Sequence, residues 1–202
     1  AVMGSNECVM AFPTRVIGLT ADPSDPNDVY AALEVAGVIR SSDGGDSWEE
    51  ITGSLAPSED TLDLHGIQCA AASPHTVYIT TRQGPFIGPD RGREWIPVEF
   101  GNFSPITYTR DLKTAPHDPN LMYVSIGAAA RSAQGALYRS HDLFRTFERV
   151  DHGIEATSTM MAVGVDPRSP NNIFCIARDG QVFGTVDDGA NWTTYKLPDK
   201  AK

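Results

Sequence analysis

The octapeptide SSDGGDSW, residues 41–48, places a hydroxyl, a carboxylate and an indole at fixed spacing. Ser41 and Asp43 stand two residues apart, and Gly45 and Trp48 follow. A serine near a carboxylate suits nucleophilic or acid–base chemistry. The same residues also suit a tight turn, because an Asp side chain accepts hydrogen bonds from nearby backbone amides and Gly permits a positive φ.

The pattern occurs four times, at intervals of about 45 to 52 residues. We name the copies box 1 (41–48), box 2 (88–95), box 3 (140–147) and box 4 (185–192). Box 2 lacks the hydroxyl, and box 3 carries Phe144 and Phe147 where the others have Gly and Trp. The box residues are Ser41, Asp43, Gly45, Trp48, Asp90, Gly92, Trp95, Ser140, Asp142, Phe147, Thr185, Asp187, Gly189 and Trp192.

A second signature runs in phase with the boxes. Each box is preceded by a proline with an aromatic residue four positions later, in PNDVY, PHTVY, PNLMY and PNNIF. A short apolar stretch precedes each proline, and no segment shows helical periodicity. Each unit therefore predicts four antiparallel strands, with the box between the third and fourth.

Four such units predict an all-β fold, a β-propeller or partial propeller of about four four-stranded antiparallel blades. The expected blades span about 14–55, 63–100, 107–151 and 159–198, within a single domain over 1–202 that could be part of a larger ring. In this fold the box residues have a structural task. The Asp fixes the turn, the Gly allows its backbone conformation, and the Trp buries a large apolar surface.

Composition excludes several classes of function. Acidic residues number 26 against 16 basic ones, a net charge of −10, so we expect no nucleic-acid partner. No apolar run reaches the length of a membrane span. Cys8, Cys69 and Cys175 form no disulfide framework or zinc motif, the five histidines are scattered, and no Gly-rich phosphate loop is present. We therefore expect no metal and no cofactor.

The topology of a blade predicts where a ligand binds. The first turn and the box lie at one end, whereas the loop between strands two and three shares the other end with the connection to the next blade. That second end carries the predicted ligand-binding residues Arg82, Arg110, Arg131, Arg178 and His65. Arginines bind anions bidentately, but exposed arginines also form ordinary ion pairs, here with Asp111 or Asp179. The third unit's loop, GAAARSAQG, is longer than its counterparts and suits a specificity element.

The Ser/Thr-x-Asp-x-Gly-x-x-Trp repeats resemble the Asp-box, or bacterial neuraminidase repeat, superfamily of β-propellers. The resemblance extends from about Val16 to Pro198. It implies a fold shared by sialidases, xyloglucan-active glycosidases, sortilin-type receptors and a photosystem assembly factor, and it favours an extracellular or periplasmic location. Since such propellers usually have six or more blades, we expect a homo-oligomer or a partner chain that completes the ring.

The resemblance leaves two classes of function open, because the superfamily contains enzymes and binders. The first is a non-catalytic ligand-binding or assembly propeller, with a carbohydrate, an anionic small molecule or a protein at the end opposite the boxes, or a structural subunit of a larger ring. The second is a glycoside hydrolase, sialidase-like or xyloglucanase-like, for which the candidate catalytic residues are Tyr108, Asp111 and Glu34. The Arg-Ile-Pro stretch of sialidases is absent.

Overall fold

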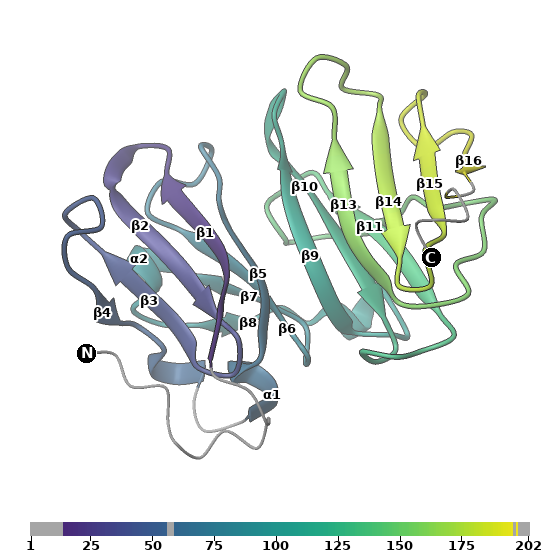
Figure 1. Ribbon diagram of the computed structural model, residues 1–202. Coiled ribbons are helices and arrows are strands. Elements are labelled where there is room, and N and C mark those ends of the chain that lie inside the picture. Colours follow the sequence, from purple (N-terminus) through teal and green to yellow (C-terminus); the bar gives the residue numbers. More distant parts are fainter. Residues whose placement is uncertain (1–13, 56–58, 196, 198–202) are drawn as a thin grey trace. The chain divides into compact units, whose positions relative to one another are not determined.

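The computed structural model describes residues 14–55, 59–195 and 197 (Figure 1). These residues form four antiparallel sheets of four strands each, in which the strands pair in chain order. The prediction of an all-β fold built from four-stranded blades is confirmed. The described helices are short: α1 (Glu59–Leu62), α2 (Pro89–Gly92), and 3₁₀ turns at Gly53–Leu55 and Phe100–Asn102.

The strands of the first two blades are β1 (Val16–Asp22), β2 (Asp25–Leu33), β3 (Gly37–Ser41) and β4 (Glu49–Glu50), then β5 (Leu64–Cys69), β6 (Val77–Thr81), β7 (Pro85–Gly88) and β8 (Ile96–Pro97). Those of the third and fourth blades are β9 (Tyr108–Ala115), β10 (Asp118–Gly127), β11 (Gly135–Ser140) and β12 (Glu148–Arg149), then β13 (Met160–Val165), β14 (Ile173–Ala177), β15 (Val182–Thr185) and β16 (Thr193–Tyr195). Each box connects the third strand of its blade to the fourth.

The chain divides into two compact units, residues 1–98 with blades 1 and 2, and residues 99–202 with blades 3 and 4. In each unit the core lies where one blade packs against the next. Tyr30 and Val38 of blade 1 pack with Ile67 and Ile79 of blade 2 in the first unit. The second unit repeats this arrangement with Tyr123, Leu137, Val163 and Phe183. A blade therefore buries its apolar face on a neighbouring blade.

In each unit a box residue of the second blade bonds to the first blade. The indole Nε1 of Trp95 in box 2 donates to the Ile51 carbonyl of blade 1 at 2.9 Å, and Nε1 of Trp192 in box 4 donates to the Val150 carbonyl of blade 3 at 2.9 Å. Ile51 and Val150 both follow the fourth strand of their blades. Trp48 instead donates to the Gly45 carbonyl of its own box at 3.0 Å.

The box Asp and hydroxyl close the turn itself. In box 1 the Asp43 carboxylate accepts hydrogen bonds from the Ser41 hydroxyl at 2.6 Å and the Ser47 amide at 2.9 Å, and the Ser41 hydroxyl oxygen accepts from the Gly45 amide at 2.8 Å. Gly45 has a φ of 107°. Box 3 keeps a positive φ of 72° at Phe144, whose fully buried ring packs on Phe147. Packing of the two rings offsets the cost of the positive φ, which is unfavourable for a residue with a side chain.

The Trp95→Phe variant is expected to lower the free energy of unfolding by about 1 to 3 kcal/mol, because it leaves the Ile51 carbonyl without its indole donor. Trp48→Phe is the matched control and should cost less, since Trp48 is half-exposed and bonds only within its own turn. Urea unfolding of both variants measures the difference. Equal losses would contradict a joining role for the box 2 indole.

Candidate functional site

The loop end of the second unit, opposite its boxes, carries the longest loop between a second and a third strand in the described chain. It is formed by the β10–β11 loop (128–134), the β12–β13 connection (150–159) and the β14–β15 loop (178–181). The Thr159 hydroxyl donates to the Ala129 carbonyl at 2.6 Å and accepts from the Ser132 amide at 3.2 Å. Gly135 is required beside this contact, because a side chain there would collide with the Ser158 carbonyl. The long loop is thus fixed to the connection.

The β14–β15 loop joins the same network. The Thr157 hydroxyl donates to Asp179 Oδ2 at 2.6 Å, and the Asp179 amide donates to the Ser158 hydroxyl at 3.0 Å. Arg178 Nη1 donates to the Ala130 carbonyl in the long loop at 3.3 Å. Polar side chains therefore order three loops from two blades into one surface.

Two predicted ligand-binding residues, Arg131 and Arg178, lie together on this surface, where both side chains are exposed. The other predicted residues of the second unit are more enclosed. Tyr108 is buried, and its hydroxyl lies 3.3 Å from Arg110 Nη1, which donates to it. Asp111 accepts a hydrogen bond from the Val163 amide of blade 4 at 3.1 Å and pairs with Lys113 Nζ at 3.2 Å.

The first unit places its predicted residues in two groups. His65 Nε2 and Arg82 Nε approach the same oxygen, Asp63 Oδ2, at 3.5 and 3.7 Å, and the His65 side chain is almost fully buried. Arg82 also pairs with Asp60 at 3.3 Å. Glu34 lies apart from them and accepts a hydrogen bond from Arg15 Nε at 2.7 Å.

A cavity of about 360 Å³ opens in the third blade beside the long loop. It is lined by residues 104–106, 133–136 and 154–156, together with Tyr138 and Arg149. Sequence reasoning missed Tyr138, Arg149 and Glu155, which come from the inner strand β11, the outer strand β12 and the following connection, because no motif marks them. The extra length of the 128–134 loop was the one sequence signal that pointed to this region.

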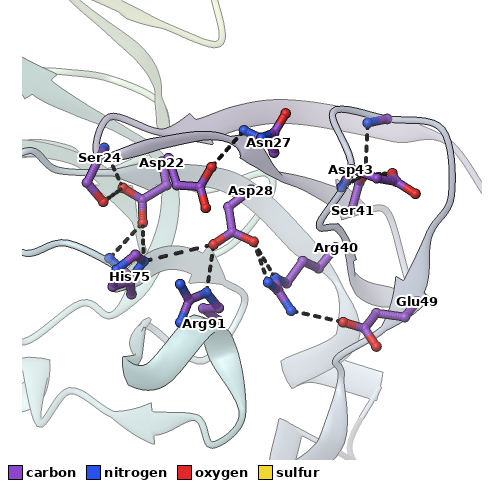
Figure 2. Close-up of polar contacts among 12 residues, drawn as sticks. Asp22, Ser24, Asn27, Asp28, Arg40, Ser41, Asp43, Glu49, His75 and Arg91 are labelled. Carbon is purple, nitrogen blue, oxygen red and sulfur yellow. Dashed lines mark hydrogen bonds and ion pairs between the residues drawn. The ribbon is translucent and has the colours of Figure 1, made fainter.

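The box end of the first unit carries a cluster of charged residues that joins blades 1 and 2 (Figure 2). Asp28 accepts hydrogen bonds from Arg40 of its own blade and from Arg91 Nε in box 2, the latter at 2.7 Å. His75 Nδ1 lies 3.2 Å from Asp22 Oδ2. Asp22, Asp28 and His75 are close enough together for metal ligands, but two guanidinium groups already engage both oxygens of Asp28, so the cluster does not fit a cation.

The same end of the second unit has an equivalent contact between blades, in which box 4 contributes a carboxylate where box 2 contributes an arginine. Arg139 of blade 3 pairs with Glu148 of its own blade at 2.5 Å and with Asp188 in box 4 at 2.8 Å. Hydrogen bonds from Arg139 hold the pKa of Glu148 below its ordinary value. The charged groups at the box ends thus stabilise contacts between blades.

Hydrogen bonds lower the pKa of several carboxyl groups in the described part of the chain. The hydrogen bond from Thr157 is the main cause that lowers the pKa of Asp179. Every carboxyl with a clear pKa shift in the described part of the chain is shifted downward: Asp22, Asp43, Asp142, Glu148, Asp166, Asp179 and Asp187. These groups are ionised at neutral pH and act as hydrogen-bond acceptors.

The described thiols are unreactive. Cys69 and Cys175 are free and buried, and burial raises the pKa of each thiol to about 12. Cys8 lies outside the described residues. Among the described helices, none has the length and apolar character needed to span a membrane.

A family model described as "Sortilin, neurotensin receptor 3" (Sortilin-Vps10) matches residues 36–178. No curated protein is similar enough in sequence to count as a relative. Similar solved structures include an ancestral GH74 enzyme, with a TM-score of 0.73 at 19% identity over 93% of this chain and 25% of the enzyme. The GH74 xyloglucanase from Xanthomonas campestris has a TM-score of 0.69 at 21% identity, covering 89% of this chain and 29% of the enzyme.

YCF48 from Cyanidioschyzon merolae has a TM-score of 0.66 at 14% identity, covering 94% of this chain and 58% of that protein. These matches agree with the Asp-box propeller superfamily and show the fold alone, since all identities are low. The chain spans between a quarter and a third of the length of the GH74 enzymes.

The Thr157→Val variant is expected to raise the pKa of Asp179 toward its ordinary value of 3.8, because it removes the hydroxyl donor. The pKa of Asp179 is lower in the folded chain than in the unfolded chain, where it has its ordinary value of 3.8. Ionised Asp179 therefore stabilises the folded chain above pH 3.8, and this contribution is lost as the pH falls through the pKa of the folded state. NMR titration of the Asp179 carboxyl measures the shift, with Thr146→Val as a control that leaves Asp179 untouched. An unchanged pKa in Thr157→Val would contradict the assigned cause.

Proposed function

Because the chain belongs to the Sortilin-Vps10 family, we propose that it is a non-catalytic binding or assembly module of β-propeller type. Its partner is a carbohydrate or a protein, and the partner docks at the loop ends, opposite the boxes. The observation that carries this proposal is the ordered surface formed by 128–134, 150–159 and 178–181 in the second unit. Three loops held by side-chain hydrogen bonds need little further ordering when a partner binds.

The state of the carboxyl groups supports binding over hydrolysis. A glycosidase needs one carboxylic acid with a raised pKa and a second carboxylate across a cleft. Among the candidates, Asp111 is engaged by the Val163 amide and Lys113, and Glu34 by Arg15. Asp179 lies on the loop surface but its pKa is lowered. The hydrolase alternative draws its support from the fold shared with the GH74 enzymes.

Exposed apolar residues support an assembly role. Leu19 on β1 is 61% exposed, whereas Ile67, the equivalent residue on β5, is 3% exposed beneath blade 1. Phe174 on β14 is 41% exposed, whereas its equivalent Tyr123 on β10 is fully buried against blade 4. These residues occupy positions that another blade covers elsewhere in the chain. A second copy of the chain, or a partner chain, is the proposed source of those blades.

Arg178→Ala is expected to weaken partner binding about tenfold, through the loss of a charged hydrogen-bonding group on the loop surface. The control is Arg168→Ala, another exposed arginine, in the turn between β13 and β14 at the box end of the same blade. Binding is measured on an array of neutral and acidic glycans and by capture of co-purifying protein. Equal effects of the two variants would contradict the proposed face.

Turnover of chromogenic glycosides, including a sialoside, that disappears in Asp111→Asn would establish the hydrolase alternative.

Light scattering of the isolated protein should give the mass of more than one chain, or of a complex with a partner. Leu19→Glu is expected to reduce that mass to a single chain, because it places a charge where another blade must pack. Ile96→Glu, an exposed residue on the outer strand β8, is the control and should leave the mass unchanged. A wild-type mass of one chain at all concentrations would contradict the assembly role.

A further inference from the structure

The cavity of the third blade has a rigid apolar wall. The Tyr138 ring is held edge-on against Phe100, with ring centroids 5.3 Å apart and planes at 71°. Ile106 and Ile154 add aliphatic surface from the connections on either side of the blade. The neighbouring positions Ala133, Gly135 and Ala136 carry almost no side chain, which leaves the space open. The wall therefore suits a small ligand with one apolar face.

The polar side of the cavity is dominated by one fixed guanidinium. Arg149 Nε and Nη2 donate to the two carboxylate oxygens of Asp151 at 2.7 and 3.2 Å. The Asp151 side chain is completely buried, whereas Arg149 is about half-exposed. The bidentate pair fixes the plane of the guanidinium and offsets its charge, so Arg149 presents hydrogen-bond donors without attracting anions strongly.

Two further polar side chains, those of Glu155 and Gln134, lie at the exposed rim. Glu155 contributes a carboxylate acceptor, and Gln134 contributes an amide that both donates and accepts. Since Arg149 is balanced by Asp151, the negative charge of Glu155 is not offset within the lining. The cavity thus disfavours anionic ligands and offers donors and acceptors side by side.

We propose that this cavity binds a neutral sugar ring, whose C–H face lies on Tyr138 and the two isoleucines and whose hydroxyl groups bond to Arg149, Glu155 and Gln134. A pyranose presents one apolar face and hydroxyls that donate and accept, which matches both sides of the cavity. A volume of about 360 Å³ lies at the lower end of the range for small-molecule sites. The inference deepens the proposed function, on which it rests, by naming the ligand class at the loop end of the second unit.

The test is NMR titration of the full chain with methyl glycosides of glucose, galactose, mannose and xylose, with glucosamine and glucuronate as the charged comparisons. We expect saturable shifts in the amides of 133–136 and 154–156 with at least one neutral glycoside. Glu155→Gln should weaken that binding about tenfold, as expected for a charged hydrogen bond. Ala133→Phe should abolish it by filling the cavity. Arg168→Ala, at the box end of the next blade and outside the lining, is the control and should bind as the wild type does.

Four results would overturn the inference. Shifts confined to Arg131 and Arg178 would place the sugar elsewhere on the loop end and would leave the proposed function intact. Wild-type affinity in both Glu155→Gln and Ala133→Phe would exclude the cavity as the binding site and would also leave the proposed function intact. Preferred binding of glucuronate or glucosamine would refute the neutral ligand class, and the absence of any sugar binding would refute both the cavity site and the carbohydrate branch of the proposed function.

Discussion

A four-stranded blade has an apolar face that only another blade can cover, and the rest of this structure depends on that constraint. In each unit the second blade packs its inner strands on the first, and a tryptophan from its box donates to the backbone just beyond the first blade's fourth strand. The indole contributes apolar area and a directional bond at the same point. The contact fixes the spacing and the angle between neighbouring blades, and so determines which loops can meet.

Several charged groups at the box ends join the blades. Asp28 is held between Arg40 and Arg91, and Arg139 between Glu148 and Asp188. The carboxylates of boxes 1, 3 and 4 accept hydrogen bonds within their own turns. Little polar chemistry is left there for a ligand. The loop ends differ, because their side chains hold loops in place while Arg131, Arg178 and the cavity of the third blade remain accessible.

Sequence patterns predicted the strands well because the box and the proline–aromatic signature mark local turns. The equivalence of Tyr30 and Tyr123 could be predicted in the same way. The pattern could not show that His65 and Arg82 share Asp63, or that the Asp111 carboxylate accepts a bond from Val163 in the next blade. Those contacts depend on how blades pack, which no local spacing encodes. Tyr138, Arg149 and Glu155 meet only after folding, for the same reason.

We infer that partners bind at the loop ends and that the box ends are structural. Hydrogen–deuterium exchange of the second unit, measured within the full chain with and without its bound partner, tests it most directly. Protection on binding is expected in residues 128–134, 154–159 and 178–181, with no change in boxes 3 and 4. Protection confined to residues 140–147 and 185–192 would contradict it, because the boxes would then be the binding surface.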